Sequence, residues 1–153
     1  MTVKWKPDGY SSVTPYLIVN GAAKALDFYK QAYGALERFR MPMPGGRIGH
    51  CEFTIGGAIV MMADEAPDMG ATAPQPGVRP PAFLMIYVED ADAVFAKAIV
   101  AGAKEYRPMT TQFYGDRSGT VTDPFGHLWT ISTHVEDVPA AEMEKRMAKM
   151  CGG

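Results

Sequence analysis

Apolar and polar residues follow a pattern that occurs twice along this chain. Residues 14–19 are an apolar run typical of a strand, and residues 22–34 repeat apolar side chains every three or four positions, as one face of a helix does. Residues 83–88 and 91–102 repeat this order, and three short strand-like runs follow each helical stretch. The sequence therefore predicts an α+β fold of two consecutive βαβββ modules, followed by a C-terminal helix.

Short runs bounded by glycine and proline supply the remaining strands. They cover residues 36–41, 47–55 and 58–63 in the first module, and residues 104–108, 119–123 and 127–135 in the second. Asn20 and Asp90 are placed to cap the two helices, because a side-chain oxygen at that position accepts from an unpaired amide of the first turn. Gly34 and Gly102 are placed to end them.

The domain boundaries follow from proline and glycine. Residues 65–81 are too rich in both for a helix or a central strand, so we expect a linker that acts as a lid or as a crossover between modules. The predicted domains are the first module (1–64), this linker (65–81), the second module (82–138), and the C-terminal helix with its tail (139–153). Methionines 143, 147 and 150 share one face of that last helix, which we expect to pack on the body or on a partner subunit.

Composition and charge narrow the class of protein. The chain has 153 residues, of which 47% are hydrophobic and 21% charged, with a net charge of −2, as is typical of a globular protein. The sequence has no basic cluster with interleaved aromatics, so we do not expect a nucleic-acid partner. No apolar run reaches the roughly 20 residues that a membrane span needs. Residues 1–7 lack the apolar segment of a signal peptide, so we expect a cytoplasmic location.

Two motifs carry a family resemblance. Leu-Asp-Phe-Tyr occurs at residues 26–29, and the stretch from Tyr114 to Val138 contains Asp-Pro-Phe-Gly at residues 123–126. Together with the tandem modules, these motifs resemble the vicinal oxygen chelate superfamily, which includes glyoxalase I, extradiol dioxygenases and the bleomycin- and fosfomycin-resistance proteins. The second motif resembles the PhnB-like branch. The resemblance implies curved mixed sheets around a cleft, a small-molecule ligand and a homodimer.

The same resemblance identifies four positions where metal enzymes of this superfamily carry their ligands. These positions hold Thr14, Met61, Phe83 and Thr130. Hydroxyl, thioether and phenyl groups do not hold a divalent metal against water, since such sites use imidazole, thiolate or carboxylate. We therefore expect no metal and no other cofactor, and no glycine-rich nucleotide loop supports the methyltransferase label that some PhnB-like relatives carry.

Four polar residues are candidates for chemistry. His50 and Glu52 lie two positions apart on a predicted strand and share a face. They are either an acid/base or off-position metal pair, or a solvated polar stripe or a single hydrogen-bonded pair. Asp116 and Arg117 are expected in a loop, where the guanidinium either binds a carboxylate or phosphonate or is simply solvated. His127 and His134 are an odd number apart, so they should point to opposite faces of their strand.

Strand alternation selects the side chains expected to line the cleft. The predicted ligand-binding residues are Thr14, Tyr16, Met61, Phe83, Met85, Tyr114, Asp116, Arg117 and Thr130. Trp129 should face the helix and belong to the core. Cys51 alternates away from His50, which disfavours a Cys–His nucleophile pair.

Two functions are consistent with these features. The first is a small-molecule binding protein of the glyoxalase/bleomycin-resistance type that has lost the usual metal chelate, with an apolar cleft and no turnover. The alternative is a glyoxalase-like enzyme (a lyase, isomerase or oxygenase) acting on a small oxygenated compound through His50 and Glu52 or through Asp116 and Arg117. The enzyme requires a titratable group with a shifted pKa in the cleft.

Overall fold

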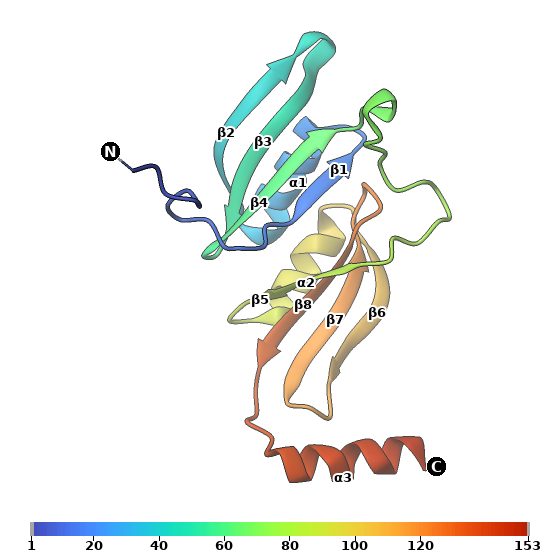
Figure 1. Ribbon diagram of the computed structural model, residues 1–153. Helices are drawn as coiled ribbons and strands as arrows, with labels where there is room; N and C mark the ends of the chain where they lie inside the picture. The colour runs from blue at the N-terminus through green and yellow to red at the C-terminus, as the bar shows by residue number, and fades with distance from the viewer. Residues whose placement is uncertain (1, 153) are drawn as a thin grey trace. The chain divides into compact units, whose positions relative to one another are not determined.

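The first sheet is a mixed sheet of four strands in the order β1-β4-β3-β2. The computed structural model describes residues 2–152 and divides them into two units, residues 2–79 and 80–152, which confirms the predicted α+β fold (Figure 1). β1 runs parallel to β4, and the other neighbours are antiparallel. The elements of the first unit are β1 (Tyr16–Val19), α1 (Ala22–Tyr33), β2 (Leu36–Met43), η1 (Pro44–Gly46), β3 (Arg47–Ile55), β4 (Ala58–Asp64) and η2 (Pro67–Met69).

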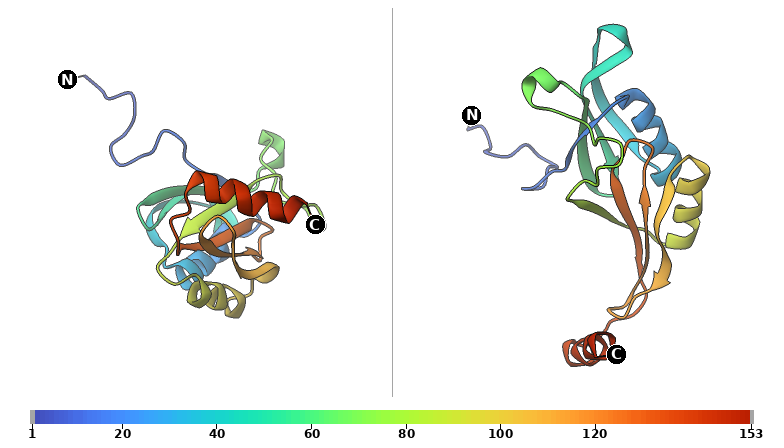
Figure 2. Two further views of the ribbon diagram at one scale, coloured as in Figure 1. Left: turned by 90° about the horizontal axis from the view of Figure 1, so that it is seen from below. Right: turned by 90° about the vertical axis from the view of Figure 1, so that its right-hand side faces the viewer.

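α1 covers one face of this sheet and closes the core of the first unit. Its apolar stripe includes Leu26 and Tyr29, both fully buried, and the Tyr29 ring stacks on Phe53 of β3 with 5.3 Å between ring centroids. Burying one such large side chain stabilises the fold by about 1.5–3 kcal/mol. Within residues 2–79 the other face of the sheet carries no α-helix, and we call it the open face (Figure 2, right).

A carboxylate from β4 caps α1, so the predicted Asn20 cap is wrong. The N-cap residue is Gly21 in a left-handed conformation (φ 101°), without a side-chain cap of its own. Asp64 Oδ1 instead accepts from the backbone amides of Gly21 (2.8 Å) and Ala22 (3.0 Å), while Oδ2 accepts from Ile48 (2.8 Å). One buried side chain thereby ties the start of α1 to β3 and β4.

The second unit repeats this topology, with strand order β5-β8-β7-β6 and a parallel β5–β8 pair. The predicted Asp90 cap is confirmed, because its side chain accepts from the Ala93 amide at 3.0 Å. Asp116 and Arg117 begin a strand and do not lie in a loop as predicted. The elements are β5 (Phe83–Tyr87), α2 (Ala91–Val100), β6 (Lys104–Thr111), β7 (Asp116–Thr122), β8 (Leu128–His134) and α3 (Ala140–Cys151).

The Asp-Pro-Phe-Gly motif forms the turn between β7 and β8. Asp123 Oδ1 accepts from the amides of Phe125 (2.8 Å) and His127 (3.0 Å), and Oδ2 accepts from Trp129 Nε1 (2.9 Å). Trp129 is fully buried, which confirms its predicted place in the core. The motif therefore fixes a tight turn and an aromatic core side chain with one carboxylate.

α3 stands apart from the sheet of the second unit (Figures 1 and 2). Arg146 attaches it through Glu136 and the backbone oxygen of Phe113. No residue of α3 is buried. Met143 is half-buried, whereas Met147 and Met150 are exposed, so the C-terminal part of its apolar face does not pack on the body. Among residues 2–152, no helix is long and apolar enough to cross a membrane.

Candidate functional site

The open face of the first sheet carries a row of side chains that crosses all four strands. Tyr16 pairs with Met61, Met61 with Glu52, and Glu52 with Phe39. Directly paired residues point to the same face, so these four form what we call the first-sheet row. Tyr16 and Phe39 at its ends are 47% and 44% exposed, whereas Glu52 in the middle is 3% exposed. The row is thus apolar and partly exposed at its ends, with one buried carboxylate between them.

A β-bulge brings an arginine to this carboxylate. Glu37 pairs with Phe53 and Phe39 with Glu52, so Arg38 and Phe39 both stand opposite Glu52. Arg38 donates to Glu52 Oε2 at 3.1 Å. This residue was not among the predicted site residues. The three-residue spacing from Leu36 to Phe39, in place of the strict alternation of a regular strand, was the available signal.

Glu52 is the centre of a hydrogen-bonded chain. His50 Nε2 lies 3.3 Å from its Oε1, and Tyr16 Oη lies 2.7 Å from His50 Nδ1. The consistent proton placement has Nε2–H donating to Glu52 and Nδ1 accepting from Tyr16. Burial raises the pKa of the Tyr16 hydroxyl, so this group remains a proton donor near neutral pH. The predicted pair His50 and Glu52 is therefore in contact, and Tyr16 extends it.

The N-terminal segment reaches the same carboxylate through Tyr10, which the sequence did not single out. Tyr10 Oη donates to Glu52 Oε2, and the Arg38 guanidinium lies over the Tyr10 ring, 5.1 Å from its centroid. The hydrogen bond to Glu52 raises the pKa of Tyr10. The segment lies on the side of the sheet opposite α1 (Figure 2, right). Since it precedes the first strand and has no periodicity, no pattern placed it there.

A cavity of about 450 Å³ opens between this segment and the sheet. Two of the predicted ligand-binding residues, Thr14 and Met61, lie in its wall beside Glu52. The cavity is lined by Trp5, Lys6, Pro7, Tyr10, Ser11, Ser12, Thr14, Glu52 and Met61.

The open face of the second sheet carries a related arrangement. Met85 pairs with Thr130, and Thr130 pairs with Thr120 and contacts its hydroxyl at 2.9 Å. Phe83 and Met85 are exposed. This row continues to Arg107 of β6, which pairs with Thr120 and lies over the Phe83 ring, 5.1 Å from its centroid. It therefore carries a cation, in contrast to the buried carboxylate of the first-sheet row.

A second buried carboxylate, Asp116, lies further along this face. It accepts from Tyr87 Oη at 2.8 Å and from His134 Nδ1 at 2.8 Å, and His134 Nε2 lies 2.8 Å from Asp137. Asp116 first, and then Asp137, raise the pKa of His134. This cluster joins β5, β7, β8 and the connection to α3.

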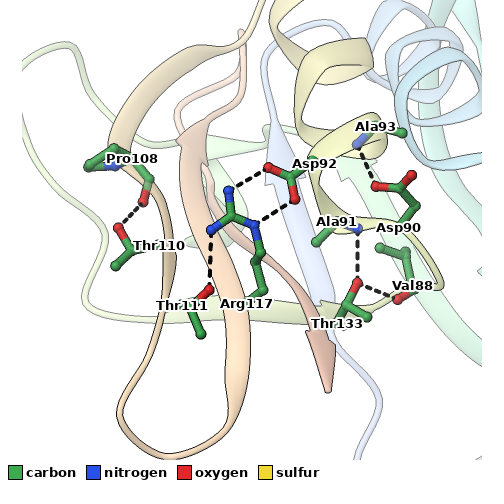
Figure 3. A network of polar contacts seen from close by, with 10 residues as sticks. All are labelled: Val88, Asp90, Ala91, Asp92, Ala93, Pro108, Thr110, Thr111, Arg117 and Thr133. Atoms are coloured by element: carbon green, nitrogen blue, oxygen red, sulfur yellow. Dashed lines mark hydrogen bonds and ion pairs between the residues drawn. The ribbon is translucent and has the colours of Figure 1, made fainter. Parts of the chain in front are cut away.

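Arg117 lies on the opposite face of β7 from Asp116. Its guanidinium forms a bidentate pair with Asp92 of α2 (2.7 and 2.8 Å) and donates to Thr111 at 3.3 Å (Figure 3). The structure does not bring Asp116 and Arg117 together. The third predicted residue of this region, Tyr114, lies in the turn before β7 with its ring edge-on to Phe113.

Cys51 is on the helix side of β3 and is fully buried, as the alternation predicted. Burial raises the pKa of its thiol to about 11. The thiolate that a nucleophile requires is therefore scarce at neutral pH.

The side chains at the superfamily's metal-ligand positions do not fit a divalent metal. Thr14, Met61, Phe83 and Thr130 offer no imidazole, thiolate or carboxylate. Across residues 2–152, no group of three or more His, Cys, Asp or Glu side chains is arranged to hold one. His50 and Glu52 supply two donor residues, and each is already hydrogen-bonded within the chain described above.

Two consecutive βαβββ units, each with a four-stranded mixed sheet, define this molecule as a tandem βαβββ protein. The family model of the Glyoxalase/Bleomycin resistance protein/Dioxygenase superfamily matches residues 11–131. The chain therefore belongs to that superfamily, as its motifs predicted.

Individual relatives agree with this assignment. An uncharacterized protein of Mycobacterium bovis is 36% identical over 145 residues, which are 93% of this chain and 95% of that protein. The crystal structure of TioX from Micromonospora sp. ML1 superposes with a TM-score of 0.63 at 26% identity, over 82% of this chain and 99% of TioX. A PhnB protein from Bacillus cereus superposes with a TM-score of 0.64 over 80% of this chain and 99% of its own, and at 19% identity this likeness shows the fold alone.

Proposed function

We propose that this chain binds a small organic molecule on the open face of its first sheet, and that it does so without the metal chelate of its superfamily. The observation that carries this proposal is the first-sheet row, an exposed apolar surface with a buried carboxylate at its centre and a cavity of about 450 Å³ beside it. Ligand sites are concave and mostly apolar, with a few polar groups that orient the ligand.

The energetics favour a ligand on this face. Tyr16, Phe39 and Met41 are each more than 40% exposed. Covering 100 Å² of such apolar surface contributes about 2.5 kcal/mol. Glu52 and its donors add direction to this non-directional attraction. The superfamily's description includes bleomycin-resistance proteins, which supports binding as a function for this fold.

Trp5 provides the experiment, because it lines the cavity whereas the second tryptophan, Trp129, is buried in the other unit. Titration with a panel of uncharged aromatic compounds should change Trp5 fluorescence saturably, and Trp5→Phe should remove the signal. Met61→Glu, which adds a second carboxylate beside Glu52, should lower affinity at least tenfold. The matched control is Met69→Glu on the exposed η2 turn, which should bind like the parent protein. Equal affinity of Met61→Glu and Met69→Glu would show that the ligand does not bind beside Met61.

The metal-free part of the proposal has its own test. Metal content by plasma mass spectrometry should be far below one equivalent, and Ni²⁺, Zn²⁺, Mn²⁺ and EDTA should leave the melting temperature unchanged. One bound equivalent that is lost in His50→Ala would overturn it.

The chain from Tyr16 through His50 to Glu52 favours a second candidate, a proton-transfer enzyme such as a lyase or isomerase. A carboxylate that fixes the imidazole tautomer, and so leaves Nδ1 as acceptor, is the arrangement of a general base. Incubating candidate ligands in D₂O and following deuterium uptake by mass spectrometry separates the two functions. Uptake that is lost in His50→Ala supports the enzyme; binding without uptake supports the binding protein.

We propose two further features of the site from the resemblance and the exposed apolar residues. The open face of the second sheet, with Phe83, Met85, Asp116 and Thr130, and Tyr114 in the turn before β7, is by itself a second ligand-binding surface. The protein is a homodimer, for which the exposed Met147 and Met150 of α3 supply apolar surface. Light scattering after size exclusion should give twice the chain mass, and a monomer mass that persists at high concentration would contradict the dimer.

A further inference from the structure

The Tyr10 side chain occupies the first-sheet site as a bound molecule would. From its contacts we infer that the ligand is a hydroxylated planar aromatic compound of the phenol class, which takes the place of this side chain. This inference rests on the proposed function and names the chemistry of the same site.

Tyr10 is the anchor of an otherwise loosely held segment. Trp5 and Val13 on either side of it are 87% and 84% exposed. Over residues 2–13, the other hydrogen bonds are internal, from Lys4 to Asp8, from Lys6 to the Tyr10 backbone oxygen and from the Tyr10 amide to the Pro7 oxygen. The phenol ring, by contrast, reaches the sheet and contacts two residues there. The sheet therefore holds the segment chiefly through a phenol.

The two contacts of the Tyr10 phenol indicate two features of the ligand, a hydroxyl group and an aromatic ring. Its hydroxyl donates to Glu52, a carboxylate that is 3% exposed and therefore needs hydrogen-bond donors. Its ring lies under the Arg38 guanidinium at 5.1 Å, a distance at which a cation is attracted to an aromatic face. A hydroxyl donor attached to an aromatic ring meets both requirements at once.

Charged ligands fit the same place less well. An anion would replace a hydrogen-bond donor by a negative charge beside Glu52, and a cation would stand against Arg38. The Glu52–Arg38 pair is already neutral as a whole, and Tyr16, Phe39 and Met61 around it offer apolar surface. A neutral phenol leaves the ion pair intact and buries its ring among these side chains.

Occupancy by Tyr10 also sets the affinity. A ligand that binds only when Tyr10 has left has its apparent affinity reduced by the fraction of molecules in which the place is empty. Removing the side chain should therefore tighten binding of a phenol. A residue that merely supported the site would have the opposite effect.

The experiment compares 2-naphthol with 2-methoxynaphthalene, which keeps the rings and lacks the donor. Affinities are measured by titration calorimetry on the parent chain, Tyr10→Ala and Glu52→Gln, with circular dichroism to verify folding. Tyr10→Ala should bind 2-naphthol at least tenfold more tightly than the parent, and at least tenfold more tightly than it binds 2-methoxynaphthalene. Tyr10→Phe keeps the ring and loses the hydroxyl, so its affinity for 2-naphthol should lie between those of the parent and Tyr10→Ala.

Failure of this inference differs from failure of the proposed function. If Tyr10→Ala binds both naphthalenes equally, or binds 2-naphthol no better than the parent does, the phenol class is wrong while binding at the first sheet stands. The Glu52→Gln variant should lose most of the preference for 2-naphthol, and an unchanged preference would contradict the role of Glu52. If no compound of the aromatic panel binds any variant, both proposals fall.

Discussion

Replacing Asp64 by asparagine tests how much of the first unit depends on one buried carboxylate. Asp64 accepts three backbone hydrogen bonds, two at the start of α1 and one from Ile48 on β3, at 2.8–3.0 Å. Asparagine keeps one oxygen, and its NH₂ group faces at least one amide that then lacks an acceptor. A hydrogen bond to a charged group contributes about 1.5–3 kcal/mol, and the bonds that asparagine retains lose their charge assistance. We therefore expect a loss of about 2–4 kcal/mol in the free energy of unfolding.

Urea unfolding followed by circular dichroism measures this loss. The matched control is Asp68→Asn, since Asp68 is exposed and its replacement should change stability by less than about 0.5 kcal/mol. If Asp64→Asn were as stable as Asp68→Asn, with an unchanged urea dependence, the cap and the strand tie would not have the strength argued here.

The same residue predicts a loss of stability in acid. Burial opposes ionisation of Asp64, but the amides of Ile48, Ala22 and Gly21 outweigh it and hold the pKa below its usual value. Because the folded pKa lies below the unfolded value of about 3.9, the stabilisation is present above that pH and is lost as the pH falls through the folded pKa. Asp64→Asn should flatten this acid limb, and an unchanged pH dependence of unfolding would contradict the assignment.

Three further predictions concern single side chains. With a thiol-specific disulfide reagent at pH 8, exposed Cys151 should react at once and Cys51 only on unfolding, because burial raises the Cys51 pKa to about 11; rapid reaction of two thiols would contradict its placement. Asp116 raises the pKa of His134, so this contribution to stability is complete below the unfolded histidine pKa of about 6.5 and is lost as the pH rises through the folded value; Asp116→Asn should lower the NMR titration midpoint of His134, and no change would refute the contact. Gly115→Ala should lower the melting temperature by several degrees, because φ is +104° and the new Cβ would stand 2.1 Å from a backbone oxygen; an unchanged melting temperature would show that the turn relaxes.

Most of the fold could be predicted from hydrophobic periodicity and from the residues typical of turns. Alternation and glycine or proline breaks predicted that each strand exists, and the observed β3, Arg47–Ile55, matches residue for residue. The start of β7 was wrong, since the strand covers Asp116–Thr122 and was predicted over 119–123. These features are local, since a strand or a capped helix depends on residues within a few positions of one another. For the same reason, Asp90 could be recognised as a cap from sequence.

The prediction that Asn20 caps α1 was wrong because the side chain that accepts these amides, Asp64, is remote in the sequence. Asp64 lies 42–43 positions from the amides that it caps, and β1 and β4 must pair before it reaches them. A local rule finds a residue able to cap. It does not show whether a carboxylate from a neighbouring strand accepts the same amides instead.

The candidate site divides in the same way. Alternation predicted that His50 and Glu52 share a face, because side chains two apart on a strand point the same way. It left open whether that is also the face of Tyr16 and Met61, and the pairing of β1, β4 and β3 brings them to one face. The four positions without metal-binding side chains were likewise readable from the sequence and the family resemblance alone.

Only the tertiary structure brought Arg38 and Tyr10 to Glu52. A single inserted bulge residue places Arg38 opposite Glu52, and strict alternation does not foresee it. Tyr10 precedes Glu52 by 42 positions and donates to it from a segment with no periodicity of its own. The sequence determined which strands form and which faces are apolar, since these depend on near neighbours. The fold decided which distant side chains share the buried carboxylate, because that depends on strand pairing and on the path of the chain across the sheet.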